Sequence, residues 1–379
     1  MKLKCDSKTL ARALDAVERV VKPRIVTPIL GHVLLEAYGD RLRLTTTDLE
    51  IGVRTSIAAE VAEEGATTAP VRLVAGVVGE LPQGQVTLAL KDGRLRISSG
   101  RFGSTLHTTD VGKFPPGPQA AEDEPIRLPK DEFLAAVGQV LPAVSTDSQN
   151  RAVLTGVLMR IESGSLTLVA TDAHRLACRR LEGVEGDSEA VVVPARAMGE
   201  LGRVFRDESG EIEMRFSPSR NQVFFHCGES EVTSRLLDGE YPRYHEIIPT
   251  KAPTVVRLPR AELVRAVRAV GVISESMSTR GVSLHAGDGV LQVFANVLQV
   301  GDAEAELEAK VVGEPVQVGF NSHFLLDALN AVSVDRVELR LIGPLAPGVV
   351  YGEGSEDYLH VVMAVRLAAP PQPSAGAAA

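Results

Sequence analysis

Apolar and polar residues follow two periods along the chain, and the same order of periods occurs three times. Three segments have apolar residues three or four positions apart, which is typical of a helix with one buried face. These segments are residues 6–21 (DSKTLARALDAVERVV), 129–144 (PKDEFLAAVGQVLPAV) and 259–274 (PRAELVRAVRAVGVIS). Each opens one copy of a longer unit.

Each predicted helix precedes stretches in which every second residue is apolar, the pattern of β-strands. Turns rich in Gly, Asp or Ser separate these stretches, which predicts β-hairpins and largely antiparallel sheets. The hairpins are expected at 29–57, 153–181 and 281–307, and further strands at 86–100, 210–228 and 337–354. A second helix is expected in each copy, at 70–81, 194–205 and 321–332.

Two landmarks relate the first copy to the second. The dipeptide Thr47-Asp48 recurs at residues 171–172 and Pro70 recurs as Pro194, so both landmarks are repeated after 124 residues. Repeated supersecondary units with a constant offset indicate tandem domains.

The fold class that follows is α+β, with three tandem domains that each have two helices packed on antiparallel sheets. Proline-containing links at 114–125 and 247–253 place the domains at 1–120, 126–250 and 253–367. The remaining segment, 368–379, has low complexity and is expected to be disordered.

Composition and cysteine content narrow the class of protein. With 44% hydrophobic and 23% charged residues, the chain is typical of soluble globular proteins. It has no apolar run long enough for a membrane span, and its first residues lack the apolar core of a secretory signal. Three widely spaced cysteines fit neither a disulfide framework nor a zinc site. We expect a cytoplasmic protein without cofactors.

The charge pattern leaves two interpretations open. A net charge of −9 argues against a simple DNA-binding module. However, basic residues recur on the exposed faces of predicted helices in all three copies, for example at Arg12, Arg203 and Arg265. They form either an ordinary solvated surface or a common surface that contacts a polyanion.

The stretch VATDAHRLACRR (169–180) combines acid, imidazole and thiol groups. If it were one extended strand, Asp172, His174, Leu176 and Cys178 would share a face. A metal-dependent hydrolase using Asp172, His174 and Cys178 is therefore one hypothesis. The corresponding stretches of the other copies, TTTDLE and FANVLQ, have neither His nor Cys, and a metal site needs further ligands. A buried or partner-contacting surface is the favoured interpretation.

Several motifs, in the same order, resemble one family. They are TPILGHVLLEA, LTTTDLEIGV, VATDAHRLA, LLDGEYPRYHEIIP, VGFNSHFLLDALNA and YLHVVMAVRL. Over residues 1–367 the chain resembles the bacterial DNA polymerase III beta subunit, the sliding clamp. The resemblance implies three clamp-type domains that form half of a closed ring. It implies a non-catalytic processivity subunit that encircles double-stranded DNA without sequence preference.

The resemblance also implies a pocket for short peptide motifs of the polymerase catalytic subunit and the clamp loader. Apolar residues of the pocket bury the anchors of the peptide. The implied pocket residues are Leu154, Thr171, Ala173, His174, Arg175, Leu176, Pro242, Ile247, Val361, Val362, Met363, Ala364, Val365, Arg366 and Leu367. The chain departs from the family at Ala173, where glycine is usual, at Glu246, where arginine is usual, and at Ala364-Val365.

DNA contacts and a dimer contact complete what the resemblance implies. Arg24 matches a family contact, and charge and position select the other DNA candidates: Lys22, Gln149, Arg151, Arg196, Arg203, Arg265, Arg268 and Arg280. The homodimer is head to tail, and its apolar contact is expected at Leu106, Val272 and Ile273. A monomeric scaffold that binds peptides but not DNA is a third hypothesis.

Overall fold

The computed structural model describes residues 1–22, 27–147, 149, 151–186, 188–275 and 280–366. The chain divides into two compact units. Unit 1 comprises Met1–Leu134, Val184–Gly186 and Val193–Leu237, and unit 2 comprises Ala135–Gly183, Asp187–Val192 and Asp238–Ala379. The division falls within the second repeat, so the domain boundaries expected from the sequence remain predictions.

Unit 1 has a five-stranded and an eight-stranded sheet within its described residues. The five-stranded sheet has the order β5 (Glu60–Glu63), β1 (Lys2–Asp6), β7 (Gln85–Lys91), β8 (Arg94–Ser99) and β9 (Phe102–His107). The eight-stranded sheet has the order β10 (Ile126–Leu128), β15 (Ile212–Phe216), β16 (Gln222–Cys227), β17 (Ser230–Arg235), β4 (Ile51–Ala58), β3 (Arg41–Thr47), β2 (His32–Tyr38) and β6 (Gly65–Pro70).

The helices of unit 1 form where the apolar spacing predicts them. α1 (Ser7–Glu18) begins after Asp6, whose side chain accepts a hydrogen bond from the Thr9 N–H at 2.8 Å. It buries one face against α2 (Val71–Gly79), β3 and β4. α4 (Ala195–Val204) packs on β17. The predicted helix at 129–144, whose residues are divided between units 1 and 2, is shorter, because α3 (Lys130–Val140) gives way to a 3-10 turn that contains Pro142.

Unit 2 repeats this construction with a larger sheet. Its nine-stranded sheet, which includes two residues of unit 1 at the end of β14, has the order β14 (Glu189–Pro194), β11 (Gly156–Glu162), β12 (Ser165–Thr171), β13 (Arg175–Glu182), β26 (Ser355–Val362), β25 (Gly348–Gly352), β24 (Arg336–Leu341), β18 (Thr254–Pro259) and β22 (Lys310–Gly313). Its four-stranded sheet has the order β21 (Gly301–Glu308), β20 (Val290–Val297), β19 (Gly281–Gly287) and β23 (Val316–Asn321).

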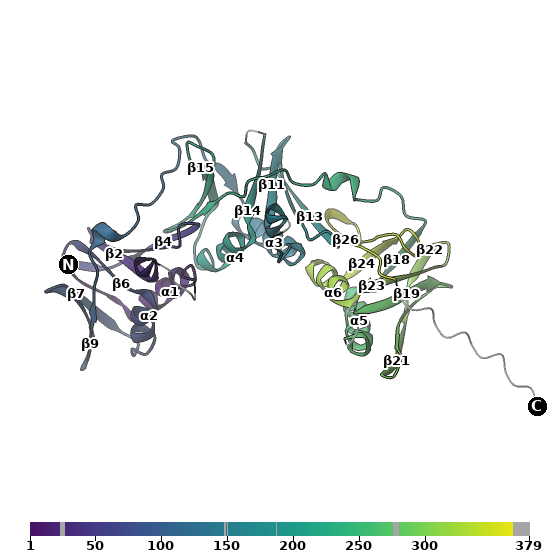
Figure 1. The fold of residues 1–379 in the computed structure, drawn as a ribbon, viewed down its shortest axis with the longest axis horizontal. Coiled ribbons are helices and arrows are strands. Elements are labelled where there is room, and N and C mark those ends of the chain that lie inside the picture. The colour runs from purple at the N-terminus through teal and green to yellow at the C-terminus, as the bar shows by residue number, and fades with distance from the viewer. Residues whose placement is uncertain (23–26, 148, 150, 187, 276–279, 367–379) are drawn as a thin grey trace, which may run out of the picture. The chain divides into compact units, whose positions relative to one another are not determined.

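Two helices of unit 2 cover these sheets. α5 (Arg260–Ser274) packs against β19, β20 and β21, and α6 (Ser322–Ala331) packs against α5, β23 and β26. Figure 1 shows α5 and α6 beside the strands they cover. The side chain of Asn321 caps α6 by accepting hydrogen bonds from the N–H groups of His323 and Phe324.

Strands of successive repeats pair edge to edge, which builds the large sheets. β4 of the first repeat pairs with β17 of the second, and β13 of the second pairs with β26 of the third. Every strand pair whose register the structure describes is antiparallel. The predicted α+β class with antiparallel sheets is therefore confirmed.

Candidate functional site: a cleft beside the Asp172 turn

The segment from Asp172 to His174 is a tight turn that joins β12 to β13. The Asp172 carboxylate accepts hydrogen bonds from the N–H groups of His174 (2.9 Å) and Arg175 (3.0 Å). The Thr171 hydroxyl donates to the Arg175 carbonyl oxygen at 2.6 Å. Short polar side chains that bind the backbone in this way are typical of turns. The expectation that Asp172 and His174 lie on one strand face with Cys178 is therefore wrong.

The departure at Ala173 falls on the most constrained position of this turn. Its φ of 73° lies in the left-handed region, where a Cβ costs about 1–2 kcal/mol. Glycine has no such cost, which fits the glycine that the family resemblance implies at this place. The turn keeps its hydrogen bonds in spite of the alanine, since the Ala173 N–H donates to the Thr171 hydroxyl at 3.2 Å.

Arg175 is held by Asp172 of its own turn and by two residues of α6 that lie more than 140 positions away in the sequence. Its guanidinium is bonded to Asp172 (3.0 Å) and to Asp327 of α6 (2.5 Å), and it stacks 4.4 Å from the ring centre of Phe324. His174 also stacks on Phe324, with ring centres 6.4 Å apart. Only 11% of the Arg175 side chain is exposed. Arg175 therefore joins the turn to α6, and its positive charge is already paired with two carboxylates.

The turn borders a cavity of about 530 Å³. Four predicted pocket residues line it, Leu154, Ala173, His174 and Arg175, together with Phe324 and the segment 144–147. A second hollow of about 570 Å³ lies between residues 151–153 and 238–243 and includes Pro242. Arg151 lines both hollows. Arg151 is one of the predicted DNA contacts, and its contact with DNA stays a prediction.

The chain segment after β26 adjoins the same turn. The Met363 N–H donates to the His174 carbonyl oxygen at 2.9 Å, and Ala364 forms a bridge with Phe320. Met363, Ala364 and Val365 are half-buried and Arg366 is exposed, whereas Leu367 lies outside the described residues.

The remaining predicted pocket residues differ in exposure. Thr171, Leu176, Val361 and Val362 are buried under the turn, and Ile247 is half-buried. Glu246 forms an exposed ion pair with Arg243 at 3.5 Å. The sequence did not predict that Phe324 and Asp327 contribute to this site, because their spacing is that of ordinary residues of a helix.

The catalytic hypothesis finds no support in the geometry. Cys178 lies in the middle of β13, opposite Val169 and Leu359, and burial raises the pKa of its thiol to about 12. A thiol with so high a pKa is a poor nucleophile near neutral pH. The described part of the chain has no cluster of three or more His, Cys, Asp or Glu side chains suited to a metal ion.

Comparison with known proteins decides the family. The N-terminal, central and C-terminal domain models of the DNA polymerase III beta subunit match residues 1–118, 127–243 and 245–366. A beta sliding clamp of Synechocystis sp. is 32% identical, and the match covers 97% of this chain and 100% of the relative. The chain belongs to the family of DNA polymerase III beta subunits, the beta sliding clamps.

Solved clamps have the same fold. The Pseudomonas aeruginosa clamp bound to griselimycin is 28% identical with a TM-score of 0.91, and the match covers 97% of this chain and 100% of that chain. The C. crescentus beta sliding clamp with bound PEG is 30% identical with a TM-score of 0.88 and the same coverage. The chain thus has three tandem clamp domains.

Membership in the clamp family settles the class of function. The chain is a non-catalytic processivity subunit, as the sequence predicted, and its partners are DNA and the polymerase. None of the described helices has the length and apolar character that a membrane crossing requires.

The side chains predicted to contact DNA differ in exposure and in whether they already form ion pairs within the chain. Arg265 and Arg268 on α5 and Gln149 are exposed, and the two arginines have no ion-pair partner among the described residues. Four others are already paired: Lys22 with Glu50, Arg196 with Asp48, Arg203 with Glu200, and Arg280 with Glu275. Arg24 lies outside the described residues.

The predicted dimer contacts lie on separate elements of the two units. Leu106 is half-buried in β9, Val272 of α5 is 68% exposed, and Ile273 is half-buried. An exposed valine on a helix that otherwise buries its apolar face is consistent with an intermolecular contact.

Proposed function

We propose that two copies of this chain join head to tail into a closed ring around duplex DNA, so that each copy forms half of the ring. The ring holds the polymerase and the clamp loader through short peptides in the cleft beside the Asp172 turn. The observation that carries the ring is a pair of edge strands, of which one bears carboxylates and the other lies beside exposed arginines.

The two edges are β9 and β21. β9 is the last strand of the five-stranded sheet, and β21 is the last strand of the four-stranded sheet. A free edge strand has backbone N–H and C=O groups that readily pair with another chain. A contact between two different edges is heterologous, and it forms a closed ring when the rotation that relates the copies closes.

Charge favours pairing of β9 with β21 over pairing of either edge with itself. Exposed carboxylates on β21 belong to Asp302, Glu304, Glu306 and Glu308, and exposed guanidiniums on and beside β8 and β9 belong to Arg94, Arg96 and Arg101. None of these side chains has an ion-pair partner within the described ranges. Opposite charges across strands stabilise a pair, whereas like charges destabilise it. Leu106, Val272 and Ile273 add apolar contact.

The cleft supplies the tether. Its walls combine the aromatic ring of Phe324 and aliphatic side chains with polar side chains such as His174 and Arg151. Pockets of this kind bind the apolar anchors of partner proteins. Because the P. aeruginosa relative binds griselimycin, we expect this chain to bind griselimycin in this cavity. A tethered polymerase rebinds before it diffuses away.

Contact with DNA rests on exposed arginines such as Arg265 and Arg268. Phosphate contacts carry no sequence information, so the ring slides freely along the duplex. Retention then depends on topology, and the ring acts in the bacterial cytoplasm, where the chromosome lies.

Retention on circular and linear DNA tests this function. The chain is loaded by a clamp loader and ATP onto a nicked circular plasmid, and the DNA-bound fraction is measured by gel filtration at high salt before and after the plasmid is cut. We expect the clamp to stay on the circle and to leave the linear product. Equal retention on both forms would show that the protein does not encircle DNA.

A further inference from the structure

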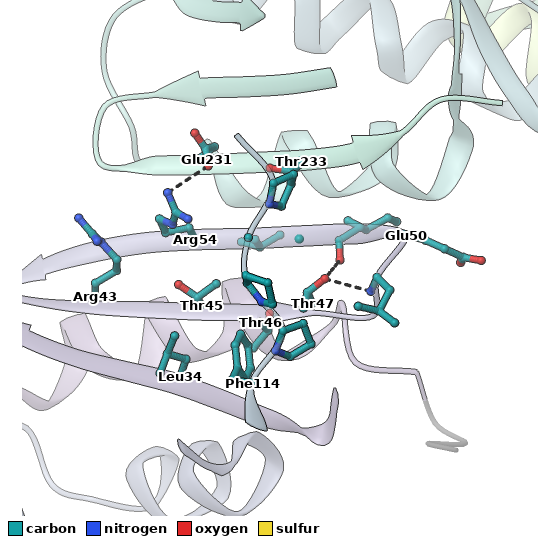
Figure 2. A pocket seen from close by; sticks show the side chains of 18 of the residues that line it. Leu34, Arg43, Thr45, Thr46, Thr47, Glu50, Arg54, Phe114, Glu231 and Thr233 are labelled. Carbon is teal, nitrogen blue, oxygen red and sulfur yellow. Dashed lines mark hydrogen bonds and ion pairs between the residues drawn. The ribbon is translucent and has the colours of Figure 1, made fainter. Parts of the chain in front are cut away.

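Unit 1 has a cavity of about 480 Å³ on the face of the eight-stranded sheet that is turned away from α1. β3 places Leu42, Leu44 and Thr46 toward α1, and the Thr46 hydroxyl donates to the Val17 carbonyl oxygen. Alternate residues such as Arg43 and Thr45 line the cavity. Figure 2 shows the segment that contains Phe114 crossing over these strands, with Thr45, Thr47 and Thr233 beside it.

The turn that borders this cavity repeats the Asp172 turn. The Asp48 carboxylate accepts hydrogen bonds from the N–H groups of Glu50 (3.0 Å) and Ile51 (2.8 Å). The Thr47 hydroxyl donates to the Ile51 carbonyl oxygen at 3.0 Å and accepts from the Leu49 N–H at 3.0 Å. Leu49, like Ala173, has a left-handed φ, of 72°. The local scaffold of the cleft is thus present twice.

The other two walls correspond as well. Gly52 is paired with Thr233 on the neighbouring repeat, and its counterpart Leu176 is paired with Val361 in the same way. The aromatic-proline pair that opens each link is Phe114-Pro115 here and residues 241–242 in unit 2. The unit 1 cavity is therefore lined by a turn, a strand of the next repeat and a link. In unit 2 the equivalent turn borders one hollow, and the equivalent link borders the neighbouring one, which shares Arg151 with it.

The side chains at corresponding positions differ in size and charge. Gly52 lines the cavity at the position that corresponds to Leu176 in unit 2, so it leaves free the space that a larger side chain would fill. The hydroxyls of Thr45 and Thr233 have no hydrogen-bond partner among the described residues, so they are available to a ligand backbone. Glu50 occupies the position that corresponds to His174 in unit 2, and 62% of its side chain is exposed. Its carboxylate already binds one ammonium group, because Lys22 Nζ lies 2.6 Å from Glu50 Oε2.

We propose that this cavity is a second peptide site, which takes a short extended peptide with a large aromatic side chain and a neighbouring Lys or Arg. The aromatic ring fills the hollow above Gly52 against Phe114, and the cation binds Glu50 in place of Lys22. The class of ligand rests on the peptide cleft proposed for unit 2. Because Glu50 places a carboxylate where unit 2 has the imidazole of His174, the two sites select different peptides.

A peptide library distinguishes the two sites. Short acetylated peptides, each with a fixed Phe beside a Lys or a Glu, are equilibrated with the full chain, and the bound fraction is measured by mass spectrometry. Gly52→Leu fills the unit 1 cavity: the Cβ meets Thr233 and Thr47 only at 3.8 Å, and the backbone is not left-handed. Ser56→Leu, on the same face of β4 but outside the cavity, is the matched control.

We expect Gly52→Leu to weaken binding of the Phe-Lys peptides about tenfold or more, as filling an anchor pocket does. Ser56→Leu and Met363→Ala should leave it unchanged. Glu50→His is a second variant, which keeps the cavity open and should shift the preference from Phe-Lys to Phe-Glu peptides. Melting curves by circular dichroism verify that each variant is folded.

The outcomes separate this inference from the proposed function. If Phe-Lys peptides bind but neither Gly52→Leu nor Glu50→His alters their affinity, the unit 1 site is refuted. The same holds if no Phe-Lys peptide binds. Griselimycin titrated against the same proteins reports on unit 2 alone. If it binds wild type and Met363→Ala abolishes that binding, the tethering cleft proposed for unit 2 stands even where the unit 1 site is refuted.

Discussion

The guanidinium of Arg196 is hydrogen-bonded to the carboxylate of Asp48, which has only 5% of its side chain exposed. Asp48 follows β3, and its carboxylate accepts the hydrogen bonds that hold the turn between β3 and β4. Arg196 is the second residue of α4, so this contact joins the first two repeats within unit 1. Arg196 also donates to the Val20 carbonyl oxygen at 2.5 Å. Arg196, which its charge and position marked as a DNA contact, is thus bound within the fold.

Arg196→Ala should destabilise unit 1. Among the residues that the structure describes, removal of the guanidinium leaves a nearly buried carboxylate with Lys22 as its one cationic neighbour, at a cost of about 1–3 kcal/mol. Arg203→Ala is the matched control on the same helix, because within the described part of the chain Arg203 pairs with Glu200 alone, three residues earlier, an interaction worth about 0.5 kcal/mol. Urea unfolding measures both. If Arg196→Ala unfolds like wild type but loses DNA binding, the contact with phosphate is the correct assignment.

The same pair makes the stability of unit 1 depend on pH. Burial by itself would raise the pKa of Asp48, but the hydrogen bonds from Arg196 and from the Ile51 and Glu50 amides lower it below the ordinary value of 3.8. A carboxyl with a lowered pKa in the folded state contributes stability above its unfolded pKa and loses it as pH falls through the folded pKa.

Asp48→Asn should therefore be less stable than wild type at neutral pH, and the difference should shrink as the pH falls below about 4. Asparagine keeps an oxygen that accepts the turn hydrogen bonds but lacks the charge that Arg196 binds. Urea unfolding of both proteins over a range of pH measures the difference in free energy of unfolding. A difference that stays constant down to acid pH would contradict the role of the charge.

Local spacing predicted much of the fold, because each helix and hairpin is specified by residues near one another in sequence. The six predicted helices are present among the described residues at the predicted places, with α1 and α3 shorter than expected. Offsets between the copies also predicted that Thr47-Asp48 and its counterpart at 171–172 would be equivalent, and their hydrogen bonds are the same.

Contacts between distant residues account for what the sequence did not predict. Arg175 meets Asp327 across 152 positions and Arg196 meets Asp48 across 148, so no local pattern identifies either partner. The helical spacing of Phe324 is that of an ordinary core residue. A small residue such as Gly52 signals a hollow only when the strands paired with it are known.

Exposed arginines of α5 should carry more DNA affinity than arginines paired within the fold. Replacing Arg265 and Arg268 together by alanine should weaken binding to duplex DNA. The logarithm of the binding constant should then fall less steeply with the logarithm of the salt concentration, by about 0.9 in slope for each phosphate that the protein no longer neutralises. Arg127→Ala is the control, because Arg127 lies 3.7 Å and 3.9 Å from Glu211 and Glu213 on a sheet strand. Fluorescence anisotropy of a labelled duplex gives both slopes; equal slopes for the double variant and wild type would exclude this surface.

Ala173→Gly should stabilise the protein by about 1 kcal/mol, because it removes a Cβ from a left-handed position. Ala177→Gly is the control four residues away: Ala177 is buried in β13 with ordinary strand geometry, so the same change should destabilise it. Thermal unfolding measures both shifts. A lower melting temperature for Ala173→Gly would show that the turn does not hold strain at this residue.

Met363 and Leu176 should respond differently to truncation, although both were predicted as peptide anchors. Leu176 is 1% exposed between β12 and β26, so Leu176→Ala removes core packing and should cost about 2–5 kcal/mol of stability. Met363 is half-buried beside the turn, so Met363→Ala should weaken griselimycin or polymerase binding by about 1 kcal/mol or more with little change in stability. Titration calorimetry and thermal unfolding separate the two effects. Unchanged binding by a folded Met363→Ala protein would place the tether elsewhere on the chain.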